Sequence, residues 1–181
     1  MHDRFGRPLT GLRVSVTNDC NLSCFYCHSE GCSSGNRQMT AEEIGKAIEL
    51  AAEFGTRKVK LTGGEPLLRD DIIEVLRAIP KPPIEEVSMA TNGTQLAGLA
   101  QDLKEAGLDR VNISLDTLDP ETYASITGKP MLEDALAGVE AALRAGLKPL
   151  KINMVLLDGI NDGEVDRMFE YASSKGAILQ L

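Results

Sequence analysis

In the stretch Arg110-Val111-Asn112-Ile113-Ser114-Leu115-Asp116, which sets the architecture, polar and apolar side chains alternate. Because successive side chains of a strand point to opposite faces, this alternation predicts a strand with one apolar and one polar face. The same alternation recurs in four further stretches, whose apolar members are Val14 and Val16, Val59 and Leu61, Val87 and Met89, and Ile152 and Met154. We expect helices to cover the apolar face and the polar face to line a ligand-holding space.

Strands of this kind alternate with helices along the whole chain. The capping box Thr40-Ala41-Glu42-Glu43 opens the first helix, and Gly55 follows its end. The predicted strands are Leu12–Thr17, Lys58–Thr62, Glu86–Ala90, Arg110–Leu115, Lys148–Val155 and Ala177–Leu181. The predicted helices cover about 40–54, 70–78, 96–106, 132–145 and 161–175, with a short helix from Asp119-Pro120. Such alternation predicts an α/β fold with a parallel sheet and right-handed crossovers.

The polar face of the predicted sheet bears on the shape of the fold. A parallel sheet covered on both faces has near-continuous apolar strands, and these strands are polar on one side. A flat sheet with one solvated face is the alternative, but a TIM-like open barrel with a polar interior fits better. Six βα units are too few for a closed eight-stranded barrel, so we expect a partial (βα)6 barrel. Its site is expected at the carboxyl-terminal edge of the strands.

Length, composition and charge limit the class of protein. The chain has 181 residues, of which 43% are hydrophobic, and its formal net charge is −8. This charge argues against a general nucleic-acid or anionic-membrane surface. No apolar run suits a membrane span or a secretory signal, which leads us to expect a cytoplasmic location. We expect one domain over residues 1–181, truncated at its C-terminus because the last predicted strand has no stop signal.

Three of the four cysteines, Cys20, Cys24 and Cys27, lie within eight residues. Such crowding in a chain expected to be cytosolic favours metal binding over a disulfide framework. Thiolates select zinc, Cu(I) and iron–sulfur clusters, and three are an incomplete set for a structural zinc site or an all-cysteine cluster. Either a fourth protein ligand, His28 or Cys32, completes the set, or one metal position stays open for a substrate.

The other special sequences also follow predicted strands. They are Gly63-Gly64-Glu65-Pro66, Thr91-Asn92-Gly93 and Ser114-Leu115-Asp116. In parallel α/β folds this edge of the sheet holds the ligand. Gly63-Gly64 would let the backbone approach a ligand closely, and Glu65 could accept hydrogen bonds from a ligand amine. A tight turn and a solvated acid are the alternative readings of these residues.

The cysteine spacing Cys20-x3-Cys24-x2-Cys27, with Tyr26 before the last thiol, resembles the signature of the radical S-adenosylmethionine (SAM) superfamily. Gly63-Gly64-Glu65-Pro66 resembles the methionine-amine-binding motif of that superfamily. A narrower resemblance is to the MoaA family, the GTP 3′,8-cyclases of molybdenum cofactor biosynthesis. Most of the narrower match lies in the N-terminal stretch, with the segments Asp3–Pro8 and Leu12–Thr17. The segments Ile113–Asp116 and Gly159–Asp162 extend the match over the chain.

The resemblance implies a lyase with a [4Fe–4S] cluster and SAM as cofactors. Three irons would bind Cys20, Cys24 and Cys27, and the fourth iron would bind SAM. One electron from a reducing donor would cleave SAM to methionine and a 5′-deoxyadenosyl radical, which acts on the ribose of GTP to form 3′,8-cyclo-GTP. The implied SAM contacts are Tyr26, Gly63, Gly64, Glu65 and Ser114, and the implied GTP contacts are Arg13, Lys60, Thr91 and Lys151. A homodimer is a further expectation.

The resembled family also carries a second cluster, on three cysteines beyond the region covered here. Cys32 matches none of those ligands, and we interpret Cys32 and His28 as loop residues. Three alternatives stay open: a radical SAM enzyme acting on another substrate such as a peptide, a zinc-binding module, and a catalytically silent fragment. The zinc alternative does not explain the glycine motif.

Overall fold

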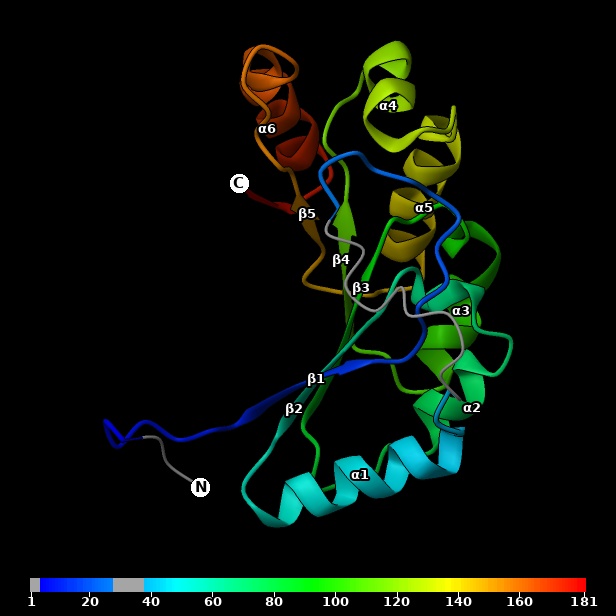
Figure 1. Cartoon of the computed structure of the whole chain (residues 1–181), viewed down its shortest axis with the longest axis vertical. Coiled ribbons are helices and arrows are strands. Elements are labelled where there is room, and N and C mark those ends of the chain that lie inside the picture. Colours follow the sequence, from blue (N-terminus) through cyan, green and yellow to red (C-terminus); the bar gives the residue numbers. More distant parts are fainter. Residues whose placement is uncertain (1–3, 28–37) are drawn as a thin grey trace.

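The computed structural model describes residues 4–27 and 38–181, and its centre is one sheet of six parallel strands. The strands stand in sequence order, and each pairs in parallel with the next. They are β1 (Gly11–Ser15), β2 (Lys58–Thr62), β3 (Glu86–Thr91), β4 (Arg110–Ser114), β5 (Lys151–Asn153) and β6 (Ile178–Gln180). Parallel neighbours need a crossover, and helices supply these crossovers (Figure 1). The predicted α/β class and open parallel sheet are confirmed.

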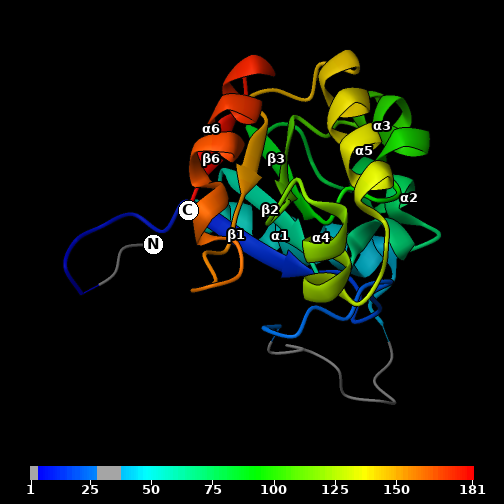
Figure 2. The same cartoon turned by 90° about the horizontal axis from the view of Figure 1, so that it is seen from above.

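The helices lie on the outer side of the curved sheet (Figure 2). They are α1 (Ala41–Glu53), α2 (Ile72–Arg77), α3 (Leu96–Glu105), α4 (Pro120–Thr127), α5 (Leu132–Arg144) and α6 (Val165–Ser174), with short 3-10 turns η1 (Pro66–Leu68) and η2 (Asp162–Glu164). The predicted capping box is present, since the Thr40 hydroxyl accepts from the Glu43 N–H and the Glu43 carboxylate accepts from the Thr40 N–H. In the described part of the chain, no helix combines the length and apolar character that crossing a bilayer requires.

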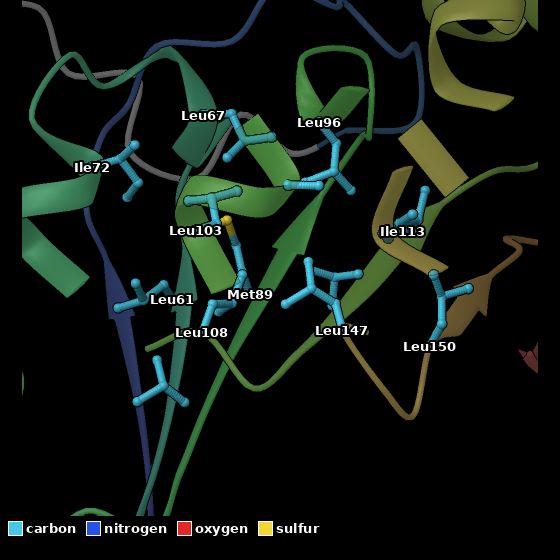
Figure 3. Close-up of a cluster of buried hydrophobic side chains, with 14 of the residues drawn as sticks. Leu61, Leu67, Ile72, Met89, Leu96, Leu103, Leu108, Ile113, Leu147 and Leu150 are labelled. Carbon is cyan, nitrogen blue, oxygen red and sulfur yellow. The ribbon is translucent and has the colours of Figure 1, made fainter. Parts of the chain in front are cut away.

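The core lies between the helices and the apolar face of the sheet (Figure 3). Leu61, Met89 and Ile113, from three neighbouring strands, are all 0% exposed. Leu103 and Leu147 pack into the same cluster and are also fully buried. The alternation that predicted the strands thus separates a buried face from a polar one, as expected.

Several boundaries differ from the predicted ones. The fifth strand is Lys151–Asn153 instead of Lys148–Val155. Pro149 has no N–H to donate to a ladder, and the Val155 N–H donates to the Asp116 carboxylate instead of to a strand. The helix predicted from Asn161 begins at Val165, because the 3-10 turn η2 precedes it. These local partners shorten elements that pattern alone would extend.

Candidate functional site

The segment 16–27, called here the cysteine loop, runs beside the glycine motif that follows β2. The Gly64 N–H donates to the Thr17 carbonyl at 2.9 Å, and the Glu65 N–H donates to the Asp19 carbonyl at 2.7 Å. A Cβ added to Gly63 would lie 2.5 Å from the Thr17 oxygen, and one added to Gly64 would lie 2.3 Å from the Asp19 oxygen. We expected these glycines to admit a ligand. In the structure, the cysteine loop occupies the space against both glycines.

The far end of the cysteine loop is tied to the last turn of α4 and to the end of β4. The Ser23 and Phe25 N–H groups donate to the carbonyls of Thr127 and Ile126, at 2.9 and 3.1 Å. The Tyr26 hydroxyl donates to Asp116 Oδ2 at 2.5 Å. Cys24 lies between the two backbone bonds, so the loop places this thiol through its backbone.

The three thiols are unpaired and at least partly accessible. Cys20 and Cys27 are exposed and Cys24 is half-buried, and all three are free cysteines. Burial, together with the negative charge of Asp116, raises the pKa of Cys24 to about 11, and burial also raises the pKa of Cys20. Among residues 4–27 and 38–181, no three or more His, Cys, Asp or Glu side chains are grouped so as to hold one metal ion. His28 and Cys32 lie outside the described residues.

Glu65 is fully buried, and three donors from its surroundings satisfy its carboxylate. Oε1 accepts from the Leu67 N–H at 3.0 Å and from the Thr91 hydroxyl at 2.7 Å, and Oε2 accepts from the Asn92 N–H at 2.7 Å. Burial raises the pKa of Glu65, and these hydrogen bonds oppose that rise. Glu65 therefore joins the glycine motif to the end of β3, where we expected it to face a ligand amine.

Thr91, expected among the substrate contacts, is 3% exposed. Its hydroxyl donates to Glu65 and accepts from the Gly93 N–H at 3.0 Å. The strand alternation already places Thr91 on the apolar side of β3. The geometry therefore makes Thr91 a positioning residue for the turn after β3.

That turn is hydrogen-bonded to the cysteine loop through side-chain amides. The Asn92 amide donates to Asn21 Oδ1 at 2.9 Å, and the Asn21 amide donates to the Thr94 hydroxyl at 2.9 Å. Asn21 directly follows Cys20 in the chain. The ends of β2 and β3 thus position the first thiol by a continuous polar network.

Cationic side chains form a row across the polar face of the sheet. The register pairs Arg13 with Lys60, Lys60 with Ser88, and Ser88 with Arg110, in β1 to β4. These residues line a pocket of about 270 Å³. Burial lowers the pKa of Lys60, and the positive charges of Arg13, Arg110 and Lys151 lower it further. The structure thus brings together three of the four expected substrate contacts, Arg13, Lys60 and Lys151, and leaves Thr91 apart.

Ser114, at the end of β4, and Asn153, at the end of β5, are neighbours on the polar face of the sheet. Ser114 is exposed and pairs in register with Asn153 of β5. The Asn153 Oδ1 atom is buried without a hydrogen-bond partner in the described part of the structure. A buried acceptor without a donor is unusual, which marks Asn153 as a candidate ligand contact beside Ser114.

Several residues that shape the site had no role assigned to them from the sequence. Asp116 accepts from both Tyr26 and the Val155 N–H, and Asn161 is 0% exposed. Arg69 is 8% exposed and donates to the Val16 and Met39 carbonyls, each at 2.7 Å.

Arg110 shares the polar alternation of its strand, and this signal could have identified it. The other contacts join residues distant in sequence, and no local pattern encodes them.

We expect Asn161→Ala to lower the free energy of unfolding by about 2–4 kcal/mol. The Asn161 amide donates to the Asp116 and Val155 carbonyls at 2.7 and 2.9 Å, and its Oδ1 accepts from the Leu157 N–H at 2.8 Å. Alanine would leave these groups unpaired next to Asp116. Urea denaturation measures the change, with the exposed neighbour variant Asp162→Ala as control. Equal stability of the two variants would contradict this role.

The family model described as the Radical SAM superfamily matches residues 14–172. The chain is 52% identical over 179 residues to a Probable GTP 3′,8-cyclase of Pyrococcus abyssi, covering 99% of this chain and 58% of the relative. It is 49% identical over 181 residues to the protein of that name from Methanothermobacter marburgensis, covering 100% of this chain and 59% of the relative. The chain thus spans just under three fifths of these relatives.

Solved structures share the fold at low sequence identity. Streptococcus suis SuiB bound to S-adenosylmethionine superposes with a TM-score of 0.77 and 20% identity, over 92% of this chain and 38% of SuiB. Native anSMEcpe with bound AdoMet superposes with a TM-score of 0.72 and 19% identity, over 94% of this chain and 50% of that protein. The family model covers most of the chain, and the cysteine loop, the glycine motif and the open parallel sheet agree with it. The chain belongs to the radical SAM superfamily.

Proposed function

We propose that this chain is the core of a GTP 3′,8-cyclase-type enzyme, which uses a [4Fe–4S] cluster and SAM to cyclise GTP to 3′,8-cyclo-GTP. One observation carries the proposal: the loop with three free thiols follows β1 at the carboxyl edge of the sheet, and a row of cations lies on the polar face nearer the strand starts. A triphosphate needs cations, and Arg13 and Lys60 supply them within one pocket. The names of the similar curated relatives support GTP as the substrate.

The cysteine loop fits a cluster by the chemistry of its donors. Cys20, Cys24 and Cys27 are free thiols, and thiolates are the usual ligands of iron–sulfur clusters. In such a cluster each of the three thiolates would bind a different iron, so the thiols need not converge on one ion. A further buried group lies near: the Tyr123 hydroxyl has no hydrogen-bond partner in the described residues, and burial raises its pKa, with a smaller contribution from the charge of Cys24.

When bound, the cluster would supply the electron that cleaves SAM. The protein positions the parts: the cysteine loop holds the three thiols, and the network of Glu65, Asn92 and Asn21 fixes where the loop leaves the sheet. Ser114 and Tyr26 face the carboxyl edge, where we place SAM. Glu65, Gly63 and Gly64 set the shape of this edge and in that way position SAM. Arg13, Lys60 and Lys151 hold the phosphates of GTP.

The electron paramagnetic resonance spectrum of the anaerobically reconstituted, reduced chain tests this proposal. We expect a [4Fe–4S]⁺ signal that changes when SAM is added, because SAM binds the iron that lacks a thiolate. Consumption of GTP is then measured directly. Stoichiometric zinc without iron would instead support the zinc-binding alternative. A SAM-sensitive signal with peptide turnover and no GTP binding would change the substrate and keep the superfamily chemistry. The electron donor, a homodimer and a cytoplasmic location stay predictions.

We expect GTP to protect Lys60 and Lys151 from amine acylation but not Lys46. The lowered pKa of Lys60 leaves its amine neutral at a lower pH, whereas the hydrogen bond to Glu42 raises the pKa of Lys46. The rate of acylation of Lys60 should therefore reach half its maximum at a lower pH than that of Lys46. Bound phosphate should shift the Lys60 midpoint upward. Mass spectrometry of acylated peptides measures each lysine, and equal protection of Lys46 would show that the effect is not specific to the pocket.

A further inference from the structure

Arg110 completes the cationic row on the polar face, and it was not among the expected substrate contacts. It begins β4 and pairs in register with Ser88, which pairs with Lys60, which pairs with Arg13. Adjacent strands are about 4.8 Å apart, so one row spans the pocket from Arg13 to Arg110. Ser88 is 2% exposed, and it lines the pocket between Lys60 and Arg110. Arg110 therefore faces the same pocket as Arg13 and Lys60.

Two side chains hold the Arg110 guanidinium in place. One terminal nitrogen donates to Asn112 Oδ1 at 2.8 Å, and the other donates to Glu86 Oε1 at 3.0 Å. Arg110 and Glu86 are both partly buried, with side-chain exposures of 19% and 28%. A guanidinium carries five N–H donors, so these two bonds leave donors that can reach a phosphate.

Glu86 is the acidic residue in the lining of this pocket. The other charged lining residues are Arg13, Lys58, Lys60 and Arg110, and Lys58 pairs in register with Glu86. A chain with a net charge of −8 thus concentrates positive charge here and places one carboxylate within it. That carboxylate attracts the Arg110 guanidinium and repels a phosphate.

We infer that Arg110 is a further phosphate-binding residue of this pocket, and that Glu86 is the acid that a polyphosphate displaces from it. For GTP as the ligand, this inference rests on the proposed function. Asn112 keeps the guanidinium oriented when Glu86 is displaced. Glu86 therefore favours ligands with several phosphates, because a single phosphate offers less charge to compete with a carboxylate already in contact.

Equilibrium binding of inorganic tripolyphosphate and of GTP to the 181-residue chain tests the inference. Arg110→Gln should weaken both ligands about tenfold or more, the loss that follows removal of a charged hydrogen-bond donor. Glu86→Gln should tighten both severalfold, and a gain of affinity cannot come from misfolding. Arg110→Lys should retain part of the binding. The Glu42 and Lys46 pair on α1, joined at 2.8 Å, supplies charge-matched controls, Glu42→Gln and Lys46→Gln.

The outcomes separate the inference from the proposed function. The inference is overturned if Arg110→Gln weakens binding no more than Lys46→Gln does, or if Glu86→Gln does not tighten binding. This holds even where the wild-type chain binds GTP. Tripolyphosphate binding that depends on Arg110 and Glu86 supports it, and GTP binding no tighter than tripolyphosphate would then count against GTP as the substrate. Absence of binding of either anion to the wild-type chain overturns the inference and leaves the cluster and SAM tests standing.

Discussion

Cys24→Ala should abolish cluster assembly and SAM cleavage together. The thiol is held by two backbone bonds to α4, from the neighbouring residues Ser23 and Phe25, and alanine leaves both bonds in place. Loss of function in this variant therefore reports on the ligand and not on the loop. We expect SAM cleavage to fall by more than about a hundredfold, since even outer partners of metal sites cost 10–100-fold. Iron and sulfide content, the reduced electron paramagnetic resonance spectrum and methionine release measure the effect.

The matched control is Cys32→Ala. The sequence predicts no ligand role for Cys32, so this variant should assemble the cluster and cleave SAM as the parent does. Cleavage at the parent rate in Cys24→Ala would sink the radical SAM mechanism for this chain. If Cys32→Ala also loses its metal, and the parent chain holds zinc, the zinc-binding module is favoured instead.

Gly64→Ala should have the second largest effect, through the placement of the cysteine loop. The added Cβ would lie 2.3 Å from the Asp19 oxygen and 2.7 Å from the Asn18 oxygen. Both contacts are with backbone, and the Asp19 carbonyl is already held by the Glu65 N–H at 2.7 Å, so no flexible side chain can move aside. We expect a loss of about 1–3 kcal/mol in the free energy of unfolding and a marked loss of bound iron.

Gly98→Ala is the matched control for this substitution. Gly98 lies within α3, and a Cβ there meets nothing within 4 Å. Alanine in a helix interior stabilises by up to about 1 kcal/mol over glycine, so Gly98→Ala should bind iron normally and unfold at the same or a higher temperature. Thermal unfolding and iron content compare the two variants. Parent-like iron content in Gly64→Ala would show that the motif is not needed to position the loop.

Residue chemistry and spacing were sufficient to predict the six strands and the parallel sheet, and they indicate its carboxyl edge as the place of the site. Alternating faces are a local property, and Val59, Leu61, Val111 and Ile113 bury the side that the pattern predicts. The crowding of Cys20, Cys24 and Cys27 is equally local, because all three lie in one loop. Three of the expected substrate contacts share the polar face for the same reason.

Tertiary structure decided which of these polar groups remain available to a ligand. Glu65 and Thr91 occupy expected positions along the chain, yet they bond to each other and to the turn after β3. Gly63 and Gly64 face the cysteine loop, and Asp116 and Asn161 tie the ends of β4 and β5 together. These hydrogen bonds join residues from 26 to 45 positions apart. Such contacts depend on how crossovers bring strand ends together in space, which no short stretch of sequence records.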